Sequence, residues 1–168
     1  RCTDSAGDGR LNAAARGLMA NKNEIASRRR ARSKLVQALY QYALTGQSAA
    51  EIERQFIAEG LGDIDVPYFS ESVHAVIDRV EELDRLLIGL LDRPPVQLDP
   101  VERSILRLGA DELSARLDIP CRVVIYEAIE LAQRFGAEKS HRYINGVLDR
   151  LAREIEPRAL ERTQGRSS

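Results

Sequence analysis

The stretch CRVVIYEAIELAQRFG, residues 121–136, decides between two fold classes. Its opening, CRVVIY, is rich in β-branched and aromatic side chains, a composition typical of strands. The stretch then continues, without a turn, into apolar residues spaced three or four apart, and it ends at Gly136. This is the period of an amphipathic helix followed by a common stop signal. We therefore interpret the whole stretch as one helix that opens at Pro120, and we find no convincing strand elsewhere.

The segments on either side of this helix have the same period. In LDPVERSILRLGADELS, residues 98–114, Asp99 can cap a helix and Pro100 takes its first position. In SHRYINGVLDRLAREI, residues 140–155, the apolar residues again return every three or four positions. Both segments are predicted to be helices.

Two further helical patterns precede them. Ser48 and Glu51 have the spacing of a capping box, in which each residue hydrogen-bonds the backbone of the other. The apolar residues of 67–90 fit either one long helix or two helices joined near Glu81.

An all-α protein of six or seven helices follows, and its short connections favour bundle packing. The proline pair in RPP, residues 93–95, ends one helical pattern and divides the chain. We expect an N-terminal helical bundle over 27–93 and a C-terminal one over 94–156. The remainder is an N-terminal extension, 1–26, and a C-terminal tail, 157–168.

Charge is distributed unevenly along the chain. Residues 1–34 hold nine Lys or Arg and three Asp or Glu. Residues 35–168 hold sixteen Lys or Arg and twenty-three Asp or Glu. A basic arm on an acidic body indicates an anionic partner, although a solvated tail without a partner is the alternative.

The termini and the apolar content bound the class of protein. Residues 1–26 lack apolar periodicity, so we expect disorder there, and Met19, the only methionine, is a candidate native start. The longest apolar run, LLIGLL at 86–91, is too short to span a membrane.

Cys2 and Cys121 lie far apart, and nothing indicates a disulfide framework. We expect a cytoplasmic protein.

The basic arm, SRRRARSKLVQALYQYALTG at 27–46, places five cations where the sequence predicts the start of a helix. A helix N-terminus carries partial positive charge, so cations there are unfavourable. We expect this end to be loose in the free protein and to become ordered on a polyanion such as RNA. The candidate phosphate-binding residues are Arg28, Arg29, Arg30, Arg32 and Lys34.

A second candidate lies in RFGAEKSHRYINGVLDR, residues 134–150. Phe135 and Tyr143 flank the cations Lys139 and Arg142 around a loop between two helices, and His141 lies among them. Exposed aromatic rings beside cations suit single-stranded nucleic acid, because bases stack on the rings. The alternative is that both rings are core residues. Gly146, inside the last helix, predicts close approach to a neighbouring helix.

Motifs for catalysis or cofactor binding are absent from the sequence. There is no Gly-rich phosphate loop, no Cys-x-x-Cys pair and no His-Glu-x-x-His, and the two histidines have no neighbours at ligand spacing. We therefore predict no catalytic residue, no metal site and no cofactor.

Three stretches together resemble one family. RRRARSKLVQALYQ, LDPVERSILRLGADEL and VVIYEAIELAQRFGAEKSHRYINGVLDRLA are similar to the bacterial NusB antitermination family, in the right order and spacing. The resemblance covers roughly residues 28–155. It implies about seven helices in two packed three-helix-type bundles and a non-enzymatic role. It also implies binding to boxA RNA of ribosomal RNA leader transcripts, pairing with the ribosomal protein NusE, and entry into an RNA polymerase antitermination complex with other Nus factors.

The resemblance also implies which residues make contacts. Arg28, Arg29, Arg30 and Arg32 match the arginine-rich arm, while Phe135, Lys139 and Tyr143 match the part of the body that meets RNA. Tyr40 and Glu102 match the side that faces NusE. For Tyr40 a core role is the alternative, and for Glu102 a carboxylate that only stabilises the helix dipole. The chain departs from the usual family pattern at Lys139, Tyr126 and Asp111.

Three other interpretations remain. A non-catalytic interaction module with a nonspecific basic tail would have the same composition. A helix-turn-helix DNA binder is disfavoured because its recognition helix should be polar and basic, whereas 121–135 is mostly apolar or acidic. Self-association into a homodimer is left open by the sequence.

Overall fold

The structure, a computed structural model, describes residues 6–165, with side chains from residue 15 onward. Within these residues it contains eight α-helices, one short 3₁₀ helix and no strand, which confirms the all-α prediction. The helices are α1 (Ala6–Thr45), α2 (Ala49–Glu59), α3 (Val66–Asp78), α4 (Val80–Ile88), α5 (Pro100–Ala115), α6 (Cys121–Phe135), α7 (Ser140–Glu154) and α8 (Glu156–Gln164), with η1 (Pro95–Gln97) between α4 and α5.

Local signals set two helix starts as predicted. At α2, the Ser48 hydroxyl accepts from the Glu51 backbone N–H, and the Glu51 carboxylate accepts from the Ser48 backbone N–H at 3.0 Å. At α5, the Asp99 carboxylate accepts from the backbone N–H of Val101 at 2.9 Å and from that of Glu102. Both arrangements satisfy backbone donors that the first helical turn leaves free.

The pattern over 67–90 forms two helices, α3 and α4, which meet at Arg79. The Arg79 side chain lies between the two helices and α5, where it pairs with Asp111 at 2.8 Å and with Glu82. Beyond Arg79 the chain turns, so that α4 packs against α5 and α7. The sequence pattern places α4 in the N-terminal bundle, where it contacts α3, and the structure also packs it against two helices of the expected C-terminal bundle.

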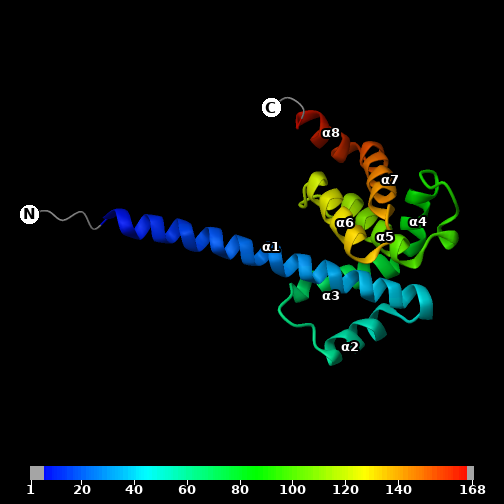
Figure 1. Ribbon diagram of the computed structural model, residues 1–168, viewed down its shortest axis with the longest axis horizontal. Helices are drawn as coiled ribbons and strands as arrows, with labels where there is room; N and C mark the ends of the chain where they lie inside the picture. The colour runs from blue at the N-terminus through cyan, green and yellow to red at the C-terminus, as the bar shows by residue number, and fades with distance from the viewer. Residues whose placement is uncertain (1–5, 166–168) are drawn as a thin grey trace, which may run out of the picture.

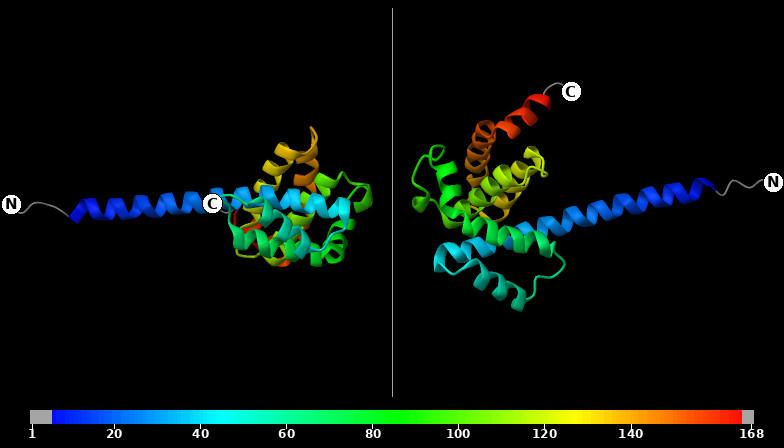
Figure 2. Two further views of the ribbon diagram at one scale, coloured as in Figure 1. Left: turned by 90° about the horizontal axis from the view of Figure 1, so that it is seen from below. Right: turned by 180° about the vertical axis from the view of Figure 1, so that it is seen from behind.

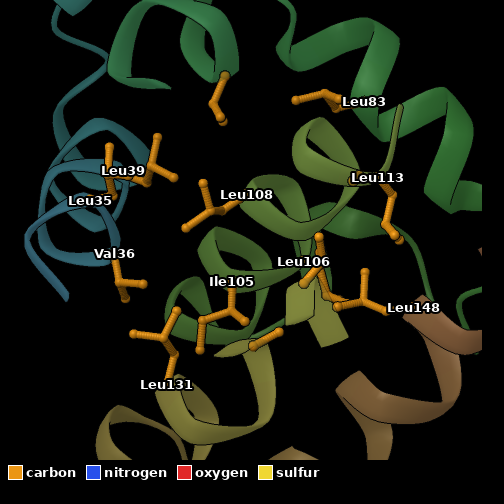
Figure 3. Close-up of a cluster of buried hydrophobic side chains, with 14 of the residues drawn as sticks. Leu35, Val36, Leu39, Leu83, Ile105, Leu106, Leu108, Leu113, Leu131 and Leu148 are labelled. Atoms are coloured by element: carbon orange, nitrogen blue, oxygen red, sulfur yellow. The ribbon is translucent and has the colours of Figure 1, made fainter. Parts of the chain in front are cut away.

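One hydrophobic core joins the two halves, and α5 lies at its centre, in contact with α1, α3, α4, α6 and α7. Figure 3 shows Leu35 and Leu39 of α1 facing α5, while Leu148 of α7 packs on the other side. Gly109 allows this second contact, because a Cβ atom there would lie 2.8 Å from a Leu148 methyl carbon. Each large apolar side chain that is fully buried in this way stabilises the fold by roughly 1.5–3 kcal/mol.

The N-terminal extension differs from its prediction. Residues 6–26, expected to be disordered, continue α1 without interruption, and Figures 1 and 2 show this part projecting away from the bundles. The segment contains no proline and several alanines, and extending an existing helix costs far less than nucleating one. Residues 1–5 lie outside the described residues, and a native start at Met19 stays a prediction.

The predicted C-terminal tail also differs, since its first part forms α8 and buries Arg158 completely. The guanidinium donates hydrogen bonds to backbone carbonyls at the end of α5 and just beyond it, and it pairs with Glu161. The carbonyls belong to Glu112, Leu113, Arg116 and Ile119. The sequence analysis missed this helix because its buried anchor is an arginine, a residue type that is usually exposed.

Of the helices that the structure describes, none combines the length and the hydropathy needed to cross a membrane.

Candidate nucleic-acid interface

The basic arm lies inside a helix, because α1 begins at Ala6 and continues past Lys34. The expectation of a loose helix end is therefore wrong. Because the partial charge of a helix acts only within its first turn, the dipole does not repel these cations. The positive charge of the arm is instead balanced by groups from other elements of the fold.

Arg28 and Arg30 are balanced by the connection between α2 and α3. Arg28 pairs with Asp65 at 2.9 Å, and its guanidinium carbon lies 4.8 Å from the centre of the Tyr68 ring. Arg30 donates to the Asp63 backbone carbonyl at 2.6 Å and pairs with the Asp63 carboxylate at 3.0 Å.

Arg29 points in another direction, toward α6. Its Nε donates to Glu127 at 2.7 Å, and its guanidinium lies over the ring of Tyr126, 5.6 Å from the ring centre. The hydrogen bond and the charge of Glu127 raise the pKa of Arg29. The arm thus divides its cations between two faces of α1.

Arg32 is a core residue, only 4% exposed. Its Nε donates to Glu112 at 3.1 Å, and the Tyr68 hydroxyl donates to the same carboxylate oxygen. Burial lowers the pKa of Arg32, but the charge of Glu112 and its hydrogen bond with Arg32 contribute to raising it, and the pKa is raised overall. Because this guanidinium is enclosed and paired, Arg32 is not available to RNA, and its assignment as a phosphate contact is corrected.

The remaining cations of the arm are accessible. The side chains of Arg28, Arg29 and Arg30 are 38%, 50% and 47% exposed. Lys34 is half-buried and has no ion pair within the described part of the chain. Four of the five predicted arm residues can therefore meet a ligand.

The second predicted cluster lies at the C-terminal end of α6 and in the loop that follows it. Phe135 is partly buried against the core, and the Arg134 guanidinium lies 5.2 Å from its ring centre. Tyr143 is also partly buried, with its hydroxyl donating to Asp92 at 2.9 Å. Each ring is therefore both a core residue and a candidate for stacking on a base, since part of it packs on the core and part meets solvent.

Arg93 is a residue of this cluster that the sequence analysis did not predict. Its guanidinium lies 5.7 Å from the Tyr143 ring centre, and its Nε pairs with Asp92 at 2.8 Å. Hydrogen bonds from Arg93 and Tyr143 lower the pKa of Asp92 from 3.8 to about 2. Arg93 and Tyr143 lie 50 positions apart in sequence, so no local pattern could have brought them together.

A shallow depression of about 410 Å³ lies beside these residues, lined in part by Arg93, Glu102, Lys139 and Tyr143. Lys139 and Arg142 are exposed at the start of α7. The Glu102 carboxylate accepts a hydrogen bond from the Ser140 hydroxyl at 2.6 Å, so it links α5 to the first residue of α7. The structure therefore brings Glu102, expected to face NusE, beside residues expected to face RNA.

Tyr40, the other residue expected to face NusE, is 39% exposed on α1, so the core alternative for it is excluded.

The two predicted clusters are connected through α6. Glu127 of α6 holds Arg29, and eight residues later Phe135 ends the same helix. Eight helical residues span about 12 Å, so an extended strand of RNA can reach both clusters. The Arg134 guanidinium also donates to the Ser33 hydroxyl at 3.1 Å, which fixes this end of α6 against α1.

Two departures from the family pattern have structural partners in this chain. Asp111 is 2% exposed and pairs with Arg79, and burial raises its pKa despite that partner. Tyr126 is 50% exposed and lies beneath Arg29.

The fold and this surface define a class, that of small all-α proteins that carry arginines and half-exposed aromatic rings on their surface. Residues 29–153 match the sequence model of the NusB family. The chain therefore belongs to the NusB family.

Individual relatives agree with this assignment. The transcription antitermination protein NusB of Halorhodospira halophila is 66% identical over 149 residues, which cover 89% of this chain and 96% of the relative. The protein of the same name from Alkalilimnicola ehrlichii is 48% identical, over 80% of this chain and 86% of the relative. A solved structure of T. maritima NusB is similar with a TM-score of 0.66 and 32% identity, over 75% of this chain and 90% of that one.

Proposed function

We propose that this protein acts in transcription antitermination by binding boxA RNA together with NusE and joining the RNA polymerase elongation complex with other Nus factors. The observation that carries the proposal is the surface formed by two cation clusters, one beside the middle of α6 at Glu127 and one just beyond its C-terminal end at Phe135. Family membership supports the antitermination role itself.

The arm can bind phosphate without losing its present partners. An arginine has five N–H donors, and Arg29 uses only its Nε to bind Glu127. Its terminal nitrogens remain for a phosphate, which a guanidinium binds in a bidentate manner. The carboxylate partners hold the guanidinium groups in place before RNA arrives, so less side-chain freedom is lost on binding.

The second cluster, which consists of Phe135, Lys139, Arg142 and Tyr143 and is called the loop cluster below, supplies a different kind of contact. The exposed parts of Phe135 and Tyr143 can stack on unpaired bases, while Lys139 and Arg142 meet the backbone. Stacking and charge together suit a single strand, whose bases are free to turn outward.

NusE would meet the neighbouring surface that contains Tyr40 and Glu102. Glu102 lies in the same depression as Lys139 and Tyr143, so a protein bound there would contact RNA held by the loop cluster. This proximity gives a physical reason for joint binding. We infer that the protein acts by binding alone, without catalysis, and in the cytoplasm, where transcription complexes assemble.

The alternative is an interaction module with a nonspecific basic tail. Salt bridges between Arg28, Arg29 and Arg30 and carboxylates of the body count against it, because a solvated tail would leave these cations unpaired. A homodimer stays a prediction.

Fluorescence anisotropy with labelled boxA RNA and a scrambled RNA of equal length, each with and without NusE, tests the proposal. We expect tighter binding to boxA, and a further gain when NusE is present. Equal and weak binding to both RNAs, indifferent to NusE, would overturn it.

A further inference from the structure

The exposed face of α7 carries a row of cations that follows the helical repeat. Lys139, at the N-cap, and Arg142, Arg150 and Arg153 recur at intervals of three, eight and three residues. At about 100° per residue these positions lie within one narrow arc. We call these four residues the α7 stripe. The arc is opposite the buried face of α7, which consists of Ser140, Ile144, Val147, Leu148, Leu151 and Ala152.

The charge of the stripe is largely unbalanced. Lys139 and Arg142 have no ion pair within the described residues. Arg150 donates to two backbone carbonyls, those of Gly146 at 3.2 Å and Leu90 at 3.1 Å, which leave its positive charge in place.

Among the four stripe residues, only Arg153 forms an ion pair within the described residues, and it shares the carboxylate of Asp149 with another arginine. This carboxylate pairs with Arg153 at 2.8 Å and with Arg162 of α8. Because one negative charge faces two positive ones here, the stripe remains cationic on a body with an excess of acidic residues.

The stripe connects two hollows in the surface. One end reaches the depression that contains Arg93 and Tyr143. At the other end, a larger open hollow of about 1130 Å³ lies between the start of α6, α7 and α8, and its lining includes Arg122, Arg153 and Arg162. From Lys139 to Arg153 the helix rises about 21 Å, the length of several extended nucleotides.

Gly146 lies near the middle of the stripe, where the structure differs from expectation. A Cβ atom at this position would meet nothing within 4 Å, so close approach to a neighbouring helix does not explain the glycine. Glycine inside a helix is destabilising relative to alanine. Its effect here is to leave a stretch of helix backbone uncovered between cations, where another chain can come close.

We propose that the α7 stripe binds the sugar–phosphate backbone of single-stranded RNA and extends the RNA surface from the loop cluster to α8. This inference rests on the proposed function. The row of cations complements a row of phosphates, and the absence of apolar side chains from the stripe disfavours a protein partner, which would need buried anchors. Arg162 lies beyond residues 29–153, so part of this surface lies outside the region matched to the family.

The first test neutralises the part of the stripe that lies beyond Lys139 and Arg142, with the double variant Arg150→Gln and Arg153→Gln, whose side chains are both exposed. Arg54→Gln is the matched control, because Arg54 is exposed on α2, on the opposite side of the molecule from α7 (Figures 1 and 2). Anisotropy is measured with boxA RNA and with the same RNA lengthened by several nucleotides at either end. We expect the double variant to bind a lengthened RNA roughly tenfold more weakly and to reduce the salt slope by about 1.4, or 0.7 for each phosphate lost.

The second test separates binding from structure at Gly146. Gly146→Ala and Gly146→Gln should both raise the melting temperature, because each is a better helix former in open space. Only the larger Gln side chain should weaken RNA binding, by obstructing the strand. Ala58→Gln on α2 is the control for an exposed glutamine. A purely structural glycine would change the melting temperature and leave RNA affinity unaltered.

The outcomes distinguish the two proposals. If the wild-type protein prefers boxA and the stripe variants bind the lengthened RNA as tightly as the wild type, the RNA-binding role of the stripe is overturned. The proposed function then stands. No preference for boxA would overturn the proposed function, and the lengthened RNA would still test the stripe through its phosphates. If the stripe variants lose RNA affinity only when NusE is present, the stripe faces a protein and not RNA. This result also overturns the inference.

Discussion

The arginines of α1 and those of α7 have the same chemistry but different surroundings. In α1, Arg28, Arg29, Arg30 and Arg32 each pair with a carboxylate from another part of the fold. In α7, Arg153 pairs with one carboxylate, which Arg162 shares, and Arg150 donates to two backbone carbonyls. The sequence makes α1 the stronger candidate, because its cations are consecutive. The structure shows that charge density along the chain and charge available to a ligand are separate properties.

The difference arises from how each helix packs. The arm segment of α1 lies between α3, α6 and the α2–α3 connection, so most of its side chains meet protein. The stripe, in contrast, lies on the side of α7 that faces away from the core.

Removing Arg32 should have the largest effect. In Arg32→Ala the Glu112 carboxylate stays buried without its cation, and such a loss costs about 3–5 kcal/mol. Urea denaturation would measure the change in the free energy of unfolding. Arg54→Ala, on the exposed face of α2, should change it by less than about 0.5 kcal/mol. Equal stability of the two variants would contradict the structural role of Arg32.

Arg158→Ala should come next, with a loss of about 3 kcal/mol, because several buried carbonyls lose their donor. The partly exposed neighbour Arg162 is the comparison, and Arg162→Ala should cost less than about 1 kcal/mol. Thermal or urea unfolding followed by circular dichroism would rank the two. Similar, small losses would mean that α8 is not anchored by Arg158.

The triple variant Arg28→Ala, Arg29→Ala and Arg30→Ala should lose about 1–2 kcal/mol, because each half-exposed pair contributes up to about 1 kcal/mol. Its salt slope for RNA should fall by about 2. The double variant of the α7 stripe should lose RNA affinity with almost no change in stability. A triple variant that binds RNA normally would remove the arm from the RNA surface.

The smallest effect is a change in one pKa at the end of the stripe. Arg93→Ala should raise the pKa of Asp92 from about 2 toward 3.8, measured by NMR titration of the carboxyl carbon. Because the folded-state pKa is lowered, the contribution of this carboxylate to stability is present above pH 3.8 and is lost as the pH falls through about 2. Arg85→Ala, on the exposed face of α4, should leave the titration unchanged.

Prediction from sequence succeeded where neighbouring residues carry the information. The helix over 121–135 and the caps at Ser48 and Asp99 depend on side chains within a few positions of one another. Prediction from sequence failed at α8, where one buried arginine forms hydrogen bonds with carbonyls about 40 positions away. No apolar period marks such a contact.

The candidate site divides in the same way. The cations and rings of the arm and of the loop cluster are visible in the sequence as residue types, and their helical spacing follows from the backbone repeat. Whether a given arginine is enclosed, like Arg32, or exposed, like Arg142, depends on the carboxylates and helices that lie against it. Local hydrogen bonding and apolar spacing therefore determined the helices and the fold class, whereas long-range packing decided which charges remain free, because a charge is neutralised by spatial neighbours that can be distant in sequence.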